Sequence, residues 1–388
     1  MSEPRQRTEA AADAGKKSIL LVAGEASGDL HAAALVDALK QADPSIEVWG
    51  VGGQHLRAAG MHVLVDTAHV ATMGLTETFG TLGRLFGMYR RLVRFLDEQR
   101  PRLVILVDYP EFNLLLARQA KRRGVRVFYF IAPQVWAWRP GRVRKIAARV
   151  DRMAVVFPFE PELYNNGSGR RLAEFIGHPL LDRVRVTRSR GETLARHGLD
   201  PARRTLALLP GSRKKEIRYL LEPSIAAAQR LVEEDGWQAI LALAPTLTVD
   251  DLQAELGREL PIKVATDDTY NVVSAADAAL VASGTATLET ALLGCPMVIM
   301  YRVSPVTFAI AKRLVDVESI GIPNIILGRT VFPELIQSEV TPEALVAAVR
   351  GLQSRREEQS AALATVRERL GSPGAAQRAA AMVLELLR

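Results

Sequence analysis

The sequence lacks the residue patterns on which several enzyme classes depend. Its 388 residues include one cysteine, Cys295, so no disulfide can form within the chain, and the cytosol is the natural compartment. It contains no Asp-x-Asp pair, no His or Cys cluster with metal-ligand spacing and no Gly-x-Ser-x-Gly turn. A metal-dependent diphosphate transfer is therefore disfavoured, nothing suggests a covalent nucleophile, and we expect neither a metal nor another cofactor.

Long apolar segments are also missing. Residues 1–17 are polar, and the apolar run that follows extends only from Ile19 to Ala23, which is too short for a signal-peptide core. No other segment reaches the length of a membrane span. We expect a soluble or peripheral protein whose residues 1–17 form a disordered tail.

Two glycine-containing loops are present, and neither matches the common nucleotide fingerprints. Residues 18–22 read as a strand that runs into AGEASGD at 23–29, and residues 278–281 read as a strand that runs into ASGTATLE at 282–289. Such strand-to-helix turns direct backbone N–H groups and the positive end of a helix at one point, which suits an anion. Because neither loop is GxGxxG or GxxxxGK[ST], the pattern favours a phosphorylated ligand other than NAD or ATP.

Short β-branched runs alternate with helical patterns along most of the chain. This rhythm is typical of parallel sheets covered by helices, and 388 residues are too many for one core. We predict two Rossmann-like, doubly wound domains that face each other across a cleft. The predicted boundaries are an N-terminal domain at 18–180, a linker at 181–204, a C-terminal domain at 205–370 and a final helix at 371–388 that packs on the N-terminal domain.

The net charge of +7 indicates anionic partners, whether phosphate groups, anionic lipid or nucleic acid. Basic residues are concentrated at 84–102 and 139–152, although each cluster could also be an ordinary solvated helix face. Within 82–96, apolar residues recur at helical spacing with arginines largely between them. Such a basic amphipathic helix can lie at a membrane interface, and packing against the core is the alternative.

Asp108 is the candidate general base. It follows the apolar strand predicted at 103–107, so it lies at the carboxyl edge of a parallel sheet, where open α/β folds bind ligands. A carboxylate there can accept a proton from an attacking hydroxyl. The alternative is that Asp108 only caps the next turn or helix.

Two further residues suit a nucleotide diphosphate. Arg213 follows a Pro-Gly-Ser turn after the strand predicted at 205–209, and a guanidinium can form paired hydrogen bonds to phosphate oxygens. Glu289 lies just inside the helix that begins near Thr285 and could accept both ribose hydroxyls. A surface arginine and a favourably placed helix-terminal carboxylate are the corresponding structural alternatives.

Taken together, the motifs resemble those of lipid-A-disaccharide synthases, inverting glycosyltransferases of the two-domain GT-B class. The collinear segments that carry this resemblance are LVAGEASGDLH, ATMGLTETFG, VDYPEFNL, APQVWAWRPGRVRKIA, DRMAVVFPFEPELY, FIGHPLLD, LALLPGSRKKEI, ASGTATLETALLGCPMVIMYRVSP and IPNIILGR. They span about residues 18–345.

The resemblance implies roles for individual residues. Asp108 would be the base on the acceptor 6-hydroxyl, and Asn324 would lie at the active site as a second catalytic residue. The residues expected to bind substrate are Glu25, Ser27 and Gly28 in the first domain and Arg213, Ser283, Gly284, Thr285 and Glu289 in the second. Tyr109 and Glu111 depart from the Ala and Asp that the family often has, and the bulk of Tyr109 beside the base could narrow the choice of acceptor or acyl chain.

The implied reaction joins UDP-2,3-diacylglucosamine to 2,3-diacylglucosamine 1-phosphate, giving a β-1,6-linked disaccharide 1-phosphate and UDP without a metal. The resemblance also implies a cytoplasmic enzyme that is held peripherally on the inner membrane through residues 82–96. We expect no nucleic-acid partner, and self-association is left open. The alternatives are a UDP-sugar epimerase, which would turn over without an acceptor, another GT-B glycosyltransferase, or a binding module for nucleic acid or membrane.

Overall fold

The computed structural model describes residues 17–24, 26–67, 78–133, 140–314 and 319–388. The polar tail predicted at 1–17 lies almost wholly outside these residues. The chain divides into two compact units: unit 1 comprises Met1–Pro179 and Ser372–Arg388, and unit 2 comprises Leu180–Gly371.

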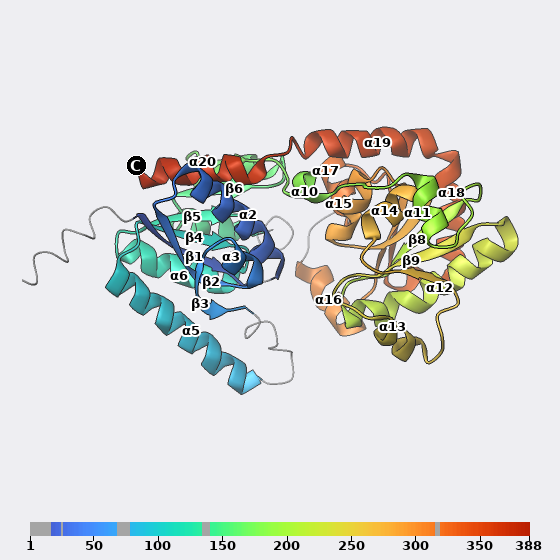
Figure 1. Cartoon of the computed structure of the whole chain (residues 1–388), viewed down its shortest axis with the longest axis horizontal. Coiled ribbons are helices and arrows are strands. Elements are labelled where there is room, and N and C mark those ends of the chain that lie inside the picture. The colour runs from blue at the N-terminus through green and yellow to red at the C-terminus, as the bar shows by residue number, and fades with distance from the viewer. Residues whose placement is uncertain (1–16, 25, 68–77, 134–139, 315–318) are drawn as a thin grey trace, which may run out of the picture. The chain divides into compact units, whose positions relative to one another are not determined.

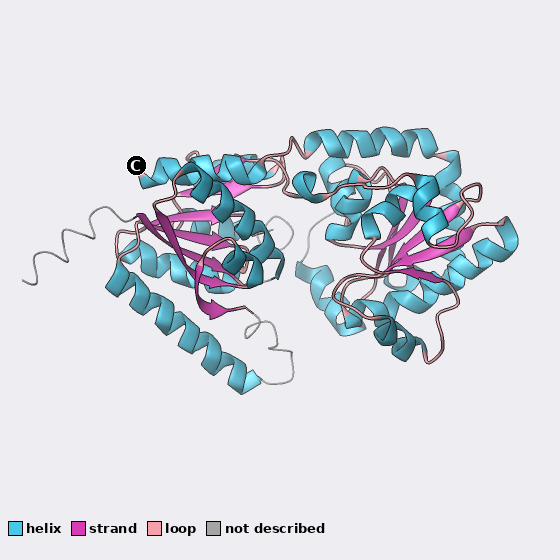
Figure 2. Cartoon of the chain, viewed as in Figure 1, coloured by secondary structure: helices cyan, strands magenta, loops and turns pink. Residues whose placement is uncertain are grey.

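Unit 1 is built on a seven-stranded parallel sheet in the order β3-β2-β1-β4-β5-β6-β7 (Figure 1). Its strands are β1 (Lys17–Ala23), β2 (Ile46–Gly52), β3 (His62–Asp66), β4 (Leu103–Val107), β5 (Arg126–Phe130), β6 (Arg152–Val155) and β7 (Ala173–Phe175). Its helices are α2 (Ala26–Ala42), α3 (Gln54–Ala58), α5 (Thr78–Gln99), α6 (Pro110–Arg122), η1 (Pro140–Arg142), α8 (Val143–Ala147), α9 (Glu160–Ser168) and α20 (Ala375–Leu387). Figure 2 shows the strands enclosed by helices on both faces.

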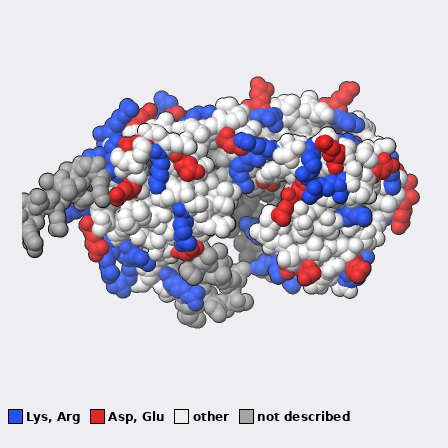
Figure 3. Space-filling model, in the orientation of Figure 1, with Lys and Arg blue, Asp and Glu red and all other residues white. Residues whose placement is uncertain are grey.

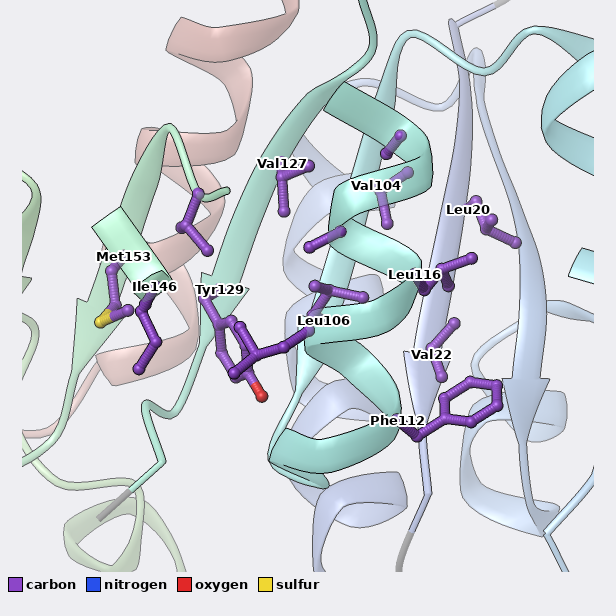
Figure 4. Close-up of a cluster of buried hydrophobic side chains, with 14 of the residues drawn as sticks. Leu20, Val22, Val104, Leu106, Phe112, Leu116, Val127, Tyr129, Ile146 and Met153 are labelled. Carbon is purple, nitrogen blue, oxygen red and sulfur yellow. The ribbon is translucent and has the colours of Figure 1, made fainter. Parts of the chain in front are cut away.

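The central strands of unit 1 are almost entirely apolar because both faces of the sheet are covered. All five residues of β4 are buried, as are the last five of β1. Alternate side chains such as Leu20, Val104 and Leu106 point to the face covered by α5 and α6, where they meet Phe112 and Leu116 (Figure 4). The packed sheet gives the loops at its edge a rigid base.

The final helix returns to unit 1. The buried side chains of α20 include Met382, Val383 and Leu387, and the helix packs against α2, β5 and β6. Polar contacts at its two ends add to this packing: Arg378 donates to the carbonyl of Ile176 at 2.7 Å, and Glu385 forms an ion pair with Arg152 at 3.1 Å.

Unit 2 repeats the pattern with a six-stranded parallel sheet in the order β10-β9-β8-β11-β12-β13. Its strands are β8 (Thr205–Leu209), β9 (Gln238–Ala242), β10 (Lys263–Ala265), β11 (Ala278–Ala282), β12 (Met297–Tyr301) and β13 (Glu334–Ile336). Its helices are α10 (Leu180–Arg183), α11 (Arg190–Arg196), α12 (Lys214–Asp235), α13 (Val249–Leu256), α14 (Thr269–Ala275), α15 (Thr285–Leu292), α16 (Pro305–Leu314), α17 (Ile322–Leu327), η2 (Gln337–Glu339), α18 (Pro342–Ser354) and α19 (Arg356–Arg369).

The segment 181–204, which the sequence predicts to be a linker, is instead an integral part of unit 2. Helix α11 begins with a capping box at Ser189 and packs on α14. The side-chain oxygen of Asn271 accepts hydrogen bonds from the backbone N–H groups of Thr187 and Arg188, and Arg190 forms an ion pair with Asp277 at 2.9 Å. Arg188 forms a further ion pair, with Asp268, so contacts with the rest of unit 2 hold this segment in place.

Helix α5 divides its apolar residues between the core and the surface. Met88, Leu92, Phe95 and Leu96 are buried, whereas Phe86 is 61% exposed. The exposed side of the helix carries Arg84, Arg90, Arg91 and Arg94, and Figure 3 shows basic side chains along it. Within the described residues, none of the helices is both long enough and apolar enough to cross a membrane.

A buried histidine makes the stability of unit 1 depend on pH. Burial, assisted by the nearby His31, lowers the pKa of His178 from 6.5 to about 3, and its ring lies 5.4 Å from that of Phe157. Above pH 6.5 this histidine is neutral in the folded and unfolded states and has no effect. Between pH 6.5 and 3 only the unfolded chain takes up the proton, so the free energy of unfolding falls with decreasing pH and levels off below about pH 3.

We therefore expect His178 to remove about 2 kcal/mol of stability between pH 7.5 and pH 5. Urea unfolding of wild type and His178→Gln at the two pH values measures this, and the variant should lose less stability on acidification. His55→Gln, which changes an exposed histidine, is the control and should behave as wild type. Equal acid sensitivity of His178→Gln and wild type would contradict the assignment.

Candidate functional site

In each sheet the strand order reverses at one point, and loops that contain predicted site residues lie there. In unit 1 the reversal falls between β1 and β4, and in unit 2 between β8 and β11. Helices on opposite faces leave the sheet at such a point, so a crevice opens at the carboxyl ends of the two strands. Residues 23, 24 and 26–28 and Asp108 flank the first crevice, and residues 210–213 and 283–285 flank the second.

The first crevice brings the early loop against the turn after β4. Ala23 and Val107 are partners in the parallel ladder, so the residues that follow them are neighbours. A Cβ atom added to Gly24 would lie 2.6 Å from the ring of Tyr109, and one added to Gly28 would lie 3.5 Å from Val107. Ser27 is exposed at the start of α2, while Glu25 lies outside the described residues.

The turn that carries Asp108 is conformationally strained. Asp108 and Tyr109 have φ values of 47° and 46°, in the left-handed region that costs a residue with a side chain about 1 kcal/mol. Two buried groups hold this turn: Asn113 donates to the carbonyl of Asp108 at 2.7 Å, and the hydroxyl of Tyr129 donates to the same oxygen at 2.6 Å. The side chain of Asp108 is half-buried at the edge of the sheet.

The second crevice opens into a pocket of about 830 Å³ within unit 2. It contains every substrate-binding residue predicted for the second domain: Arg213, Ser283, Gly284, Thr285 and Glu289. These residues come from the turn after β8 and the start of α15, which the pairing of β8 with β11 makes neighbours. The volume is sufficient for a nucleotide-sized ligand.

The start of α15 supplies hydrogen-bond donors to this pocket. Gly284, the residue before the helix, has φ 148° and ψ −159°, a conformation suited to glycine. Ser283 is fixed by its hydroxyl, which donates to the carbonyl of Ile320 at 2.9 Å. The first N–H groups of the helix have no acceptor within it and, together with the helix dipole, favour an anion.

The turn after β8 is less open than the sequence suggests. A carboxylate oxygen of Glu216 accepts hydrogen bonds from the backbone N–H groups of Ser212 and Arg213, at 2.8 and 3.3 Å. These two backbone N–H groups are therefore already engaged within the protein. The side chain of Arg213 remains 77% exposed, with a long contact of 3.4 Å to Glu216, and can extend to a phosphate group.

Glu289 is held by a tyrosine that the sequence analysis missed. The hydroxyl of Tyr270 donates to its Oε1 at 3.0 Å. Burial raises the pKa of Glu289, whereas the hydrogen bond from Tyr270 and the charge of Arg183 lower it. Burial also raises the pKa of Tyr270 to about 12, with the charge of Glu289 adding to the effect, so this hydroxyl retains its proton at neutral pH.

Arg183 and Arg185 also line the pocket and were not predicted as site residues. They belong to the segment that is predicted to be a linker. The alternation of arginine with valine at 183–186 is the sequence feature that could have indicated their role. Asp268 accepts hydrogen bonds from Arg188 and, at 2.8 Å, from Asn271, and lies 2.8 Å from Nε2 of His197. These contacts hold the segment beside the pocket.

Asn324, for which a catalytic role is predicted, is buried and hydrogen-bonded within unit 2. The residue is 1% exposed and does not line the pocket. Its amide nitrogen donates to the carbonyl of Phe332 and to Glu334, and its oxygen accepts from the backbone N–H groups of Val331 and Phe332. With these four hydrogen bonds the amide has no capacity left for a substrate.

Asn324 is connected to the pocket indirectly, through Glu334 and Ile320. Glu334, which Asn324 contacts at 2.7 Å, accepts hydrogen bonds from the backbone N–H groups of Ile320 and Gly321. The carbonyl of Ile320 in turn accepts the hydroxyl of Ser283. This geometry predicts that Asn324 is a positioning residue for the loop before α15.

Asn324→Ala should lower the free energy of unfolding by about 3 kcal/mol, because it leaves buried N–H and C=O groups without partners. Urea unfolding, followed in parallel with turnover, measures this. Loss of turnover at unchanged stability would contradict the positioning role and favour direct contact with substrate.

Comparison with known proteins identifies a single family over nearly the whole chain. The model of the lipid-A-disaccharide synthetase family matches residues 19–384. The lipid-A-disaccharide synthase of Geobacter metallireducens is 48% identical over 379 residues, which cover 96% of this chain and 98% of that protein. The corresponding protein of Syntrophus aciditrophicus is 47% identical over 378 residues, with the same coverage.

Solved structures show the fold at low sequence identity. A glycotransferase of kitacinnamycin has a TM-score of 0.64 and 17% identity, and covers 96% of this chain and 100% of its own. A putative UDP-N-acetylglucosamine 2-epimerase from Listeria monocytogenes has a TM-score of 0.60 and 13% identity, and covers 95% of each chain. The predicted class, two parallel-sheet α/β domains of the GT-B type, is confirmed. The fold alone does not separate transferase from epimerase, whereas the family match favours the transferase.

Proposed function

The chain belongs to the lipid-A-disaccharide synthetase family and is a glycosyltransferase, and from this premise we propose how its two units share the reaction. Its substrates are acylated glucosamines. Unit 2 binds the UDP part of UDP-2,3-diacylglucosamine, and unit 1 supplies the base for the 6-hydroxyl of 2,3-diacylglucosamine 1-phosphate. The observation that carries the proposal is the position of the residues themselves: an acid in one unit and an anion-binding turn in the other both lie where a parallel sheet reverses its strand order.

The nucleotide is held by groups of matching chemistry. The diphosphate lies at the first turn of α15, where Gly284 and Thr285 provide backbone donors and the helix dipole favours negative charge. Arg213, whose side chain is exposed, closes on the phosphate oxygens. Glu289 accepts the ribose hydroxyls. As the bond to the sugar breaks, these same donors stabilise the charge that develops on the departing UDP.

Asp108 performs the proton transfer. Its carboxylate takes the proton of the acceptor 6-hydroxyl while that oxygen attacks the anomeric carbon of the donor. The bond from the anomeric carbon to the phosphate oxygen breaks, UDP leaves with the electron pair, and the configuration at the carbon inverts. Asn113 and Tyr129 support this step because they fix the strained turn on which Asp108 lies.

Asp108→Asn should reduce turnover by about 10²- to 10⁴-fold, the usual contribution of a general base, with UDP affinity within about twofold of wild type. Single-turnover kinetics with both acylated substrates and calorimetric titration with UDP measure the two effects. Glu111→Gln is the matched control, since Glu111 is exposed and pairs with Arg142, and it should retain near-normal turnover. Normal turnover in Asp108→Asn would refute the proposed base.

Because its substrates carry acyl chains, we expect the enzyme to meet them at a membrane surface, and α5 has the features of a helix that binds such a surface. We assign this role to the exposed side of its middle turns, where Phe86 is 61% exposed and the guanidinium of Arg90 lies 5.8 Å from the centre of the Phe86 ring. Arg84 and Arg91 on the same helix are also exposed. An exposed aromatic ring among arginines is typical of helices that lie on anionic membranes. The enzyme would bind in this way to the cytoplasmic leaflet of the inner membrane.

Arg90→Glu/Arg91→Glu should weaken binding to phosphatidylglycerol-containing vesicles at least tenfold, because each basic residue near the surface contributes about 1 kcal/mol. Cosedimentation at low and high salt measures the affinity. The control, Arg196→Glu/Arg356→Glu, makes the same change in net charge at exposed positions of unit 2 and should leave binding close to wild type. Equal loss in both variants would show that net charge, and not α5, governs binding.

A further inference from the structure

Tyr270 and Glu289 form a pair on the wall of the unit 2 pocket. Tyr270 lies in the first turn of α14 and Glu289 in the second turn of α15, two helices that pack against each other. The phenolic hydroxyl donates to Oε1 of the carboxylate at 3.0 Å, and both residues line the pocket. Both are partly buried, so water competes only weakly with this hydrogen bond.

The direction of the hydrogen bond is fixed by the chemistry of the pair. Because the pKa of Tyr270 is raised to about 12, its hydroxyl acts as a donor throughout the neutral range. Burial is the largest influence on Glu289 and raises its pKa overall, while the hydrogen bond from Tyr270 and the positive charge of Arg183 oppose this rise and favour the carboxylate. Only the carboxylate offers two equivalent acceptor oxygens to a ligand.

Orientation is the second consequence of the contact. A glutamate side chain has three rotatable bonds, so its carboxylate can adopt many orientations. To accept two neighbouring hydroxyls, it must direct both oxygens toward the ligand. The hydroxyl of Tyr270 occupies one lone pair of Oε1 and so limits rotation of the carboxylate before any ligand arrives. Groups ordered in advance lose less entropy on binding.

We propose that Tyr270, with help from Arg183, is a positioning residue that holds Glu289 as an oriented carboxylate and thereby sets the preference of the pocket for ribonucleoside over 2′-deoxyribonucleoside diphosphates. The proposal rests on the function proposed above, in which Glu289 accepts the ribose hydroxyls. It adds that this selectivity depends on a residue outside the Gly-rich turn. If Tyr270 acted only as packing, its hydroxyl would affect ligands with and without the 2′-hydroxyl alike.

The test compares UDP with 2′-deoxy-UDP by calorimetric titration of the full chain. Wild type should bind UDP at least tenfold more tightly, since a site built around a hydroxyl rejects a ligand that lacks it. Tyr270→Phe should bind UDP about 5- to 20-fold more weakly and 2′-deoxy-UDP almost as wild type does, so that the preference largely disappears. Arg183→Gln should change the ratio in the same direction by a smaller factor.

Tyr219→Phe is the matched control, because it removes a hydroxyl from α12 at a residue packed on the unit 2 core and outside the pocket. It should keep the wild-type preference. An equal loss for both ligands in Tyr270→Phe, or no change for either, would overturn the proposal. Thermal unfolding without ligand verifies that each variant is folded.

Glu289→Ala separates the two levels of the argument. Loss of the preference in this variant supports the ribose role of Glu289, and its retention would overturn that role and the further inference together. If Glu289→Ala loses the preference while Tyr270→Phe keeps it, Glu289 binds the ribose without Tyr270, and only the further inference fails.

Discussion

The rest of the structure depends on one constraint, the reversal of strand order within a parallel sheet. At the reversal, the connections that follow the two neighbouring strands run over opposite faces of the sheet. Neither connection covers the carboxyl ends of these strands, so the backbone there stays accessible. In unit 1 the reversal lies between β1 and β4, and in unit 2 between β8 and β11. The fully buried strands on either side keep these edges rigid. The loops at the two reversals are therefore the places where binding and catalytic side chains can be held in a fixed geometry.

The two reversals carry different residues, and the difference agrees with the role proposed for each unit. At the first, a carboxylate lies on a left-handed turn that is held through its own carbonyl by Asn113 and Tyr129. This geometry suits a base, whose reach must be controlled. At the second, a helix start and the arginines at 183, 185 and 213 surround a pocket that also contains Glu289. This geometry suits a nucleotide, whose diphosphate is negative and whose ribose presents hydroxyl donors. Two acidic residues of the pocket are engaged within the protein, Glu216 by backbone N–H groups and Asp268 by Arg188 and Asn271.

Much of this architecture was accessible from the sequence, and the failures have physical causes. The central strands were predicted because burial on both faces makes them continuous apolar runs. The short strands β3, β7 and β13, which lie at sheet edges, have no such run of buried residues. The segment 181–204 looked like a linker because a charge pattern does not reveal that its arginines pair with Asp268 and Asp277, about 80 residues away in the chain. Tyr270 was missed for the same reason, since only the tertiary fold brings it to Glu289. Asn324 was expected to act directly because it matches a family motif, whereas its four hydrogen bonds lie within the protein.

The central claim is that UDP is bound at the strand reversal of unit 2. Hydrogen–deuterium exchange of the full chain, with and without saturating UDP, tests it most directly because every segment is observed at once. The account predicts slower exchange at residues 209–216, 267–271 and 282–289, with the largest change at the first turn of α15. Protection confined to residues 23–31 and 107–113 of unit 1, with the unit 2 segments unchanged, would contradict it.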